Sequence, residues 1–164
     1  MTPRLAILCL EDEPPVRDAI VRDLEPFAPT VVVETAESAD DARAALEELR
    51  ATGDHVALVL ADHLLPGETG VEFLVELHHD PDLAGARKVL VTGQAGLEDT
   101  IEAVNRAKLD HYIAKPWAPE QLRSVVRDLL TDFVAEHVDD VLPYVQVLDG
   151  GRLLAVHAKR AGDR

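Results

Sequence analysis

The sequence predicts an α/β fold, a doubly wound parallel sheet of five strands with helices on both faces. Short runs rich in valine, leucine and isoleucine alternate along the chain with longer segments of helical periodicity. The short runs are apolar at successive positions, which is typical of parallel strands buried on both faces. Strict alternation of strands and helices then favours one continuous sheet with right-handed crossovers.

The five runs expected to form strands are each a few residues long and lack internal glycine or proline. They lie at residues 5–10, 31–34, 56–61, 88–91 and 111–114.

Local signals justify the helices between the strands. Pro14 opens the first, since proline is tolerated in a first helical turn, and this helix is expected to run to about Phe27. Ser38 is an N-cap for the second, which ends before Gly53. The other helices are expected at about residues 71–80, at 97–107, and after Pro119.

Composition narrows the class of protein. With 164 residues, 47% of them apolar, the chain can form one cored domain with a modest addition. A formal net charge of -15 and a pI near 4.7 argue against direct nucleic-acid binding. Cys9 is the single cysteine, which fits a small core side chain in a reduced compartment. No membrane span or signal peptide is recognised, so a cytoplasmic protein is expected.

Charged and hydroxyl side chains follow four of the expected strands. Glu11 and Asp12 follow the first, Asp62 the third, Thr92 the fourth and Lys115 the fifth. Because parallel strands end at a common edge, these side chains are expected within reach of one another. Clustered carboxylates repel, and Mg²⁺ would relieve that repulsion and bind phosphate as well. The set therefore suits a metal-assisted phosphoryl acceptor.

The order and spacing of these motifs resemble the response-regulator receiver domain of two-component signalling. The resemblance covers about residues 4–130 and implies the flavodoxin-like strand order 2-1-3-4-5. It rests on Glu11-Asp12, Asp62 followed by Pro66-Gly67, Thr92-Gly93, and Tyr112 ahead of Lys115-Pro116.

The resemblance also implies roles. Asp62 would accept a phosphoryl group from a histidine kinase or phosphotransfer protein, and Thr92 and Lys115 would contact the phosphoryl oxygens. Tyr112 would turn inward on activation, and the Lys115-Pro116 peptide is commonly cis in this family. The Mg²⁺ ligands would be Glu11, Asp12, Asp62 and the backbone carbonyl of Leu64.

The implied activity is signalling without external turnover, limited to self-phosphorylation and autodephosphorylation. Leu64 and Gln94 occupy positions that tune phosphoryl lifetime in the family. Two alternatives stay open: a phosphatase or phosphotransferase that uses an aspartyl nucleophile, and a degenerate receiver that serves only as a binding scaffold. Leu64 argues against the first, because haloacid-dehalogenase-like enzymes carry an acid two residues after the nucleophile.

Several other residues have two interpretations. Tyr112 is either a half-buried strand aromatic or a switch. Trp117 is either a local packing residue or an anchor for a partner. His63, His78 and His79 lack further ligands at metal-site spacing, so solvated positions are expected.

Residues 1–130 are expected to form the receiver domain and residues 131–164 an extension. The fifth helix is expected to continue to about residue 138. Segments 142–148 and 152–156 flank Asp149-Gly150-Gly151 and predict a β-hairpin, followed by a frayed tail from Lys159. The hairpin would need cover from its own receiver, from a second copy in a homodimer, or from a partner.

The extension is too short for a winged-helix or helix-turn-helix module. We therefore expect output by contact with a downstream protein effector rather than through a DNA-binding domain.

Overall fold

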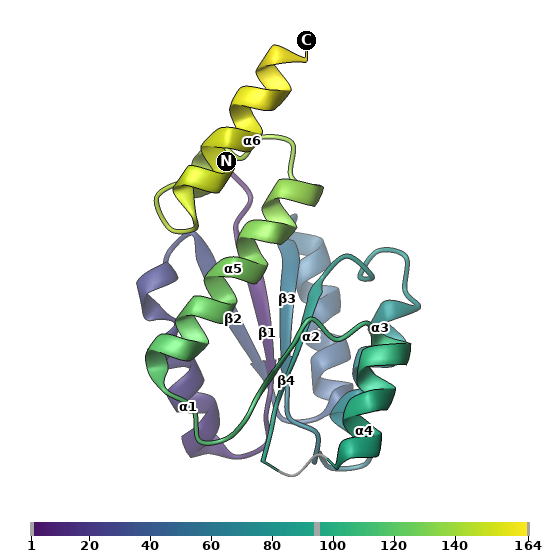
Figure 1. Ribbon diagram of the computed structural model, residues 1–164. Helices are drawn as coiled ribbons and strands as arrows, with labels where there is room; N and C mark the ends of the chain where they lie inside the picture. The colour runs from purple at the N-terminus through teal and green to yellow at the C-terminus, as the bar shows by residue number, and fades with distance from the viewer. Residues whose placement is uncertain (1, 94–95, 164) are drawn as a thin grey trace.

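Five parallel strands form one sheet in the order β2-β1-β3-β4-β5 (Figure 1). The computed structural model describes residues 2–93 and 96–163. The fold class and strand order agree with the prediction. The strands are β1 (Leu5–Leu10), β2 (Val31–Ala36), β3 (His55–Ala61), β4 (Arg87–Val91) and β5 (His111–Ile113).

The helices begin and end largely where their caps predict. Ser38 accepts a hydrogen bond from the Asp41 N–H ahead of the second helix, and Gly53 ends that helix with φ +78°. The helices are α1 (Pro14–Asp23), α2 (Ala39–Thr52), α3 (Gly70–His78), α4 (Leu97–Glu102), α5 (Pro119–His137) and α6 (Gly150–Gly162). The first helix is shorter than expected, because the chain changes to a 3-10 turn at Glu25–Phe27. A π-helical turn, Ala103–Ala107, continues α4.

Helices cover the sheet on both faces (Figure 1). Alternate residues of β1 belong to two separate core clusters: Leu5, Ile7 and Cys9 to one, Leu8 and Leu10 to the other. The first cluster also includes side chains from α1 and α5, and the second includes side chains from α2 and α3. Burial on both faces explains why β1 is apolar at every position. Among the described helices, none is both long and apolar enough to cross a bilayer.

The predicted β-hairpin is wrong, because the extension is helical. After a 3-10 turn at Leu142–Tyr144, α6 occupies the region assigned to the second hairpin strand and the frayed tail. The Asp149 side chain accepts a hydrogen bond from the Arg152 N–H, so Asp-Gly-Gly begins a helix instead of turning a hairpin. Arg160, expected to be frayed, donates hydrogen bonds to three carbonyl groups at the end of α5.

The apolar side chains of the extension are covered by their own chain. Tyr144, Leu148 and Leu153 are buried in the core cluster shared with α1 and α5. The Tyr144 hydroxyl also donates to the Pro3 carbonyl at 2.6 Å, ahead of β1, so the extension packs at the amino ends of the strands. The homodimer stays a prediction, but these side chains no longer require it. The proposed boundary at residue 130 lies inside α5.

Candidate functional site

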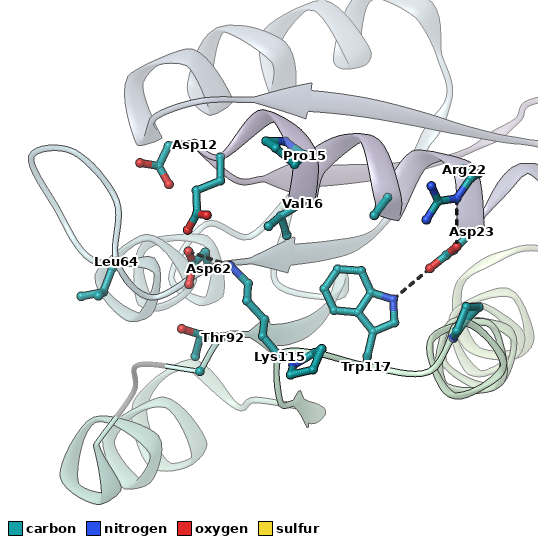
Figure 2. A pocket seen from close by; sticks show the side chains of 15 residues that line it. Asp12, Pro15, Val16, Arg22, Asp23, Asp62, Leu64, Thr92, Lys115 and Trp117 are labelled. Atoms are coloured by element: carbon teal, nitrogen blue, oxygen red, sulfur yellow. Dashed lines mark hydrogen bonds and ion pairs between the residues drawn. The ribbon is translucent and has the colours of Figure 1, made fainter.

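The sheet order brings the predicted site residues to one edge. Glu11 directly follows β1, Asp62 follows β3 and Thr92 follows β4, while Lys115 lies two residues beyond β5. The four strands are neighbours in the order β1-β3-β4-β5. The side chains at their carboxyl ends therefore lie in the same order along one edge of the sheet. Figure 2 shows the Asp12 and Asp62 carboxylates, the Thr92 hydroxyl and the Lys115 amine around one space.

Three carboxylates form an acidic cluster that fits a divalent cation. One oxygen from each of Glu11, Asp12 and Asp62 lies within 4.8 Å of the others. Glu11 and Asp62 are buried, whereas Asp12 is exposed. Glu11 Oε2 and Asp62 Oδ1 are buried oxygens that accept no hydrogen bond within the described chain. Buried carboxylate oxygens without donors are costly, and an oxygen-seeking cation such as Mg²⁺ would satisfy them.

The two buried carboxyl groups differ in acidity. Burial raises the pKa of Glu11 to about 7, and the neighbouring Asp62 carboxylate contributes to that rise. Burial also acts to raise the pKa of Asp62, but Thr92, Glu11 and Lys115 stabilise its charged form and lower the pKa overall. Asp62 is therefore the more acidic of the two buried carboxyl groups.

Lys115 bridges the two buried acids. Its Nζ lies 2.6 Å from Glu11 Oε1 and 3.1 Å from Asp62 Oδ2. Burial disfavours the ammonium form, but both carboxylates outweigh burial and raise the pKa of Lys115. The Lys115-Pro116 peptide is cis, as the resemblance implies. The ammonium group is thus charged and within reach of any group bound to Asp62.

The remaining predicted residues lie around this centre. Thr92 is fully buried, and its backbone carbonyl accepts a hydrogen bond from the Tyr112 hydroxyl at 3.0 Å. Tyr112 is partly buried and packs against the core cluster that includes Leu8 and Leu10. The Leu64 side chain is 51% exposed and lines the mouth of the site; its carbonyl as a metal ligand stays a prediction. Gln94 lies outside the described residues.

A cavity of about 760 Å³ joins the acidic cluster to the groove between α1 and the start of α5. Asp62 and Lys115 lie at one end, and Arg22 and Trp117 lie at the other (Figure 2). The wall between them is mainly apolar, from Pro15, Val16, Ala19, Pro116 and Pro119.

Gly70 allows α3 to lie close to the loop that begins at Asp62. A Cβ atom at Gly70 would lie 1.9 Å from the Asp62 carbonyl oxygen, so no larger residue fits without a backbone shift. The Gly70 N–H also donates to the His63 carbonyl. This contact fixes the chain directly after Asp62.

Two contacts at the site had no sequence signal. Trp117 donates its indole N–H to buried Asp23 at 2.9 Å, although the two residues are distant in sequence. His63 is 5% exposed, with Nε2 3.2 Å from Asp99 Oδ2, so its predicted solvated position is wrong. His79 is exposed, as expected, and His78 is partly buried.

Sheet order and site together define an α/β protein of the receiver type, with an acidic cluster at the carboxyl edge of its sheet. The family model of the response regulator receiver domain matches residues 7–127, and the chain belongs to that family.

Relatives of known name agree with this assignment. The hydrogenase transcriptional regulatory protein HoxA of Cupriavidus necator is 40% identical over 123 residues, which are 74% of this chain and 23% of that protein. Response regulator Rre1 of Synechocystis sp. is 29% identical over 131 residues, 79% of this chain and 53% of Rre1. The chain thus spans less than two thirds of either regulator.

Solved structures share the fold. A CheY-like response regulator receiver domain protein from Methanospirillum hungatei superimposes with a TM-score of 0.69 at 28% identity, covering 82% of this chain and 99% of that one. The receiver domain of an HD domain-containing protein from Pseudomonas fluorescens gives a TM-score of 0.71 at 24% identity, covering 85% and 96%.

Proposed function

We propose that this chain is a phosphoacceptor response regulator in which Asp62 takes a phosphoryl group from the phosphohistidine of a histidine kinase or phosphotransfer protein. The observation that carries the proposal is the position of Asp62. It lies beside Glu11, Thr92 and Lys115 at the edge of the sheet, and these neighbours favour its carboxylate form.

The transfer step follows from these positions. An Asp62 carboxylate oxygen attacks the phosphorus and forms an O–P bond, while the P–N bond to the donor imidazole breaks. The imidazole nitrogen leaves with the electron pair and is available for protonation. Lys115 is placed to balance charge on the phosphoryl oxygens, and the Thr92 hydroxyl is a donor of the right kind. Bound Mg²⁺ would neutralise further negative charge on those oxygens.

Glu11, Asp12 and Asp62 are the side chains that would hold the ion, together with the Leu64 carbonyl. Mg²⁺ keeps several waters in most protein sites, so three carboxylates suffice. The exposed position of Asp12 lets it bind an ion from solvent, while buried Glu11 lies beside the acceptor Asp62.

Output is proposed to occur by contact with a downstream protein effector. A phosphoryl group on Asp62 adds charge beside Thr92, whose carbonyl is bonded to the Tyr112 hydroxyl. The change at Asp62 therefore reaches the outer strand β5 through one residue. The relative HoxA is named as a transcriptional regulatory protein.

Among residues 2–93 and 96–163, no contact supports the phosphatase alternative. Leu64 supplies an apolar, exposed side chain where such enzymes carry an acid, and the scaffold alternative does not account for a full set of acceptor groups.

The test is the intact mass of the protein after incubation with Mg²⁺ and acetyl phosphate. We expect a gain of one phosphoryl group that hydroxylamine removes and that chelation of Mg²⁺ prevents. Asp62→Asn should not gain it. Equal labelling of the variant would refute the assignment of Asp62.

A further inference from the structure

Asp23 is a buried carboxylate in a position that helix energetics do not favour. It is the last residue of α1 and is 5% exposed. A negative side chain at a helix C-terminus opposes the helix dipole, and burial adds a further cost unless hydrogen bonds offset it. Its Oδ2 accepts the Trp117 indole N–H at 2.9 Å, and Arg22 Nε lies 3.7 Å from Oδ1.

The partner of Asp23 lies in the segment that carries Lys115. Trp117 follows Lys115 by two residues, in the irregular loop between β5 and α5. Its ring lies between Asp23 and Lys115 in Figure 2 and lines the same cavity as Asp62. The Asp23 carbonyl also accepts a long bond, 3.4 Å, from Arg123 on α5. The end of α1 is thus tied to this loop and to the helix that follows it.

We propose that Asp23 is a positioning residue for phosphoryl transfer: its hydrogen bond to Trp117 anchors the β5–α5 loop and so fixes where Lys115 reaches Asp62. This inference rests on the proposed function. It also assigns the single tryptophan of the chain a role inside the protein.

The position of Lys115 affects the rate of phosphoryl transfer because this reaction depends on the placement of charged groups. In phosphoryl transfer the protein contributes mainly by orienting groups and neutralising charge. The N–H donor of Trp117 gives the loop an attachment to α1 that is independent of the acidic cluster. When a phosphoryl group enters the site, the contacts of Lys115 with Glu11 and Asp62 must rearrange, whereas the Asp23–Trp117 bond can persist.

Three variants separate the hydrogen bond from charge and from packing. Asp23→Asn keeps an acceptor oxygen without charge, Asp23→Ala removes the acceptor, and Trp117→Phe keeps an aromatic ring but removes the donor. Acetyl phosphate serves as the phosphoryl donor, so the docking of a protein partner does not enter the measurement. The readout is the labelling rate at saturating Mg²⁺, with the Mg²⁺ concentration for half-maximal rate recorded separately.

We expect Asp23→Ala and Trp117→Phe each to lower the maximal rate about 3- to 10-fold, a modest fraction of what a full misplacement of about 1 Å costs. The half-maximal Mg²⁺ concentration should not change, because Glu11, Asp12 and Asp62 of the acidic cluster are untouched. Asp23→Asn should stay within about 2-fold of wild type, since the acceptor is kept. The double variant Asp23→Ala/Trp117→Phe should be no slower than either single variant, because both remove one interaction.

Wild-type rates in Trp117→Phe, or multiplicative losses in the double variant, would overturn the inference. An equal loss in Asp23→Asn would also overturn it, because charge would then be the cause. If Asp23→Ala does not fold, Trp117→Phe decides the question alone. Failure of the proposed function is distinguishable, since wild type would then not label at all or Asp62→Asn would label equally.

Discussion

Lys88 is a cation buried away from the site, at the start of β4. It is 1% exposed, and its Nζ donates to the carbonyls of Ala84 and Ala86 at 3.1 and 2.9 Å. Desolvation lowers the pKa of Lys88, although Asp110 acts in the opposite direction. The charge on Lys88 is therefore less favourable in the folded state than in the unfolded chain.

This shift predicts how stability depends on pH. Between the lowered pKa and the ordinary lysine value of about 10.4, the unfolded chain binds more protons, so the Lys88 contribution to stability rises with pH. Relative to Lys88→Met, the free energy of unfolding of the wild type should increase as the pH rises toward the ordinary lysine value, and it should level off above that value. Urea unfolding of both proteins measures this difference, and exposed Lys159→Met is the control. A pH-independent difference would contradict the lowered pKa.

At the residue scale, the predictable site residues are those whose signal is local. Asp62, Thr92 and Lys115 each follow an apolar strand run, and parallel strands share an edge, so their convergence follows from the sequence. The contacts of Asp23 and His63 could not be predicted in this way, because their partners, Trp117 and Asp99, lie in segments distant in sequence. Nothing within a few residues of Asp23 indicates that it is buried.

At the element scale, the core strands and helices were predictable and the extension was not. Five strands and five helices have repeated signals of periodicity and capping that agree with one another. Asp149-Gly150-Gly151 is compatible with both a hairpin turn and a helix N-cap. Packing decides between them, because a helix lets Leu153 enter the core while Arg160 caps α5.

The helical extension predicts an asymmetry between two adjacent leucines. Leu153 is fully buried and Leu154 is 50% exposed. Leu153→Ala should lower the free energy of unfolding by about 2–5 kcal/mol through lost burial and a residual cavity. Leu154→Ala should change it by less than about 0.5 kcal/mol. Urea unfolding tests both, and equal losses would mean that α6 does not pack on the receiver as described.

For the whole molecule, the dominant feature is negative charge. The formal net charge is -15. Three of the carboxylates, those of Glu11, Asp12 and Asp62, lie together at one edge of the sheet. Folding brings these carboxylates together, whereas the unfolded chain disperses them. A cation that binds the cluster therefore binds the native state selectively.

Mg²⁺ should raise the melting temperature through this linkage. At about 100 times its dissociation constant, a ligand that binds only the native state adds about 2.7 kcal/mol. Asp12→Ala should reduce the shift, because one carboxylate of the cluster is lost, whereas exposed Asp18→Ala on α1 should keep it. Thermal melts with and without Mg²⁺ measure this effect. An undiminished shift in Asp12→Ala would contradict the assigned metal site.

The central claim is that Asp62 is the phosphoryl acceptor, and chemical trapping tests it most directly. Borohydride reduces an aspartyl phosphate to homoserine, so the phosphorylated protein can be reduced, digested and mapped by mass spectrometry. We predict homoserine at position 62 alone, only when Mg²⁺ and the phosphoryl donor are both present. Homoserine at position 12 instead, or a phosphoryl group retained on a histidine with Asp62 unmodified, would contradict this account.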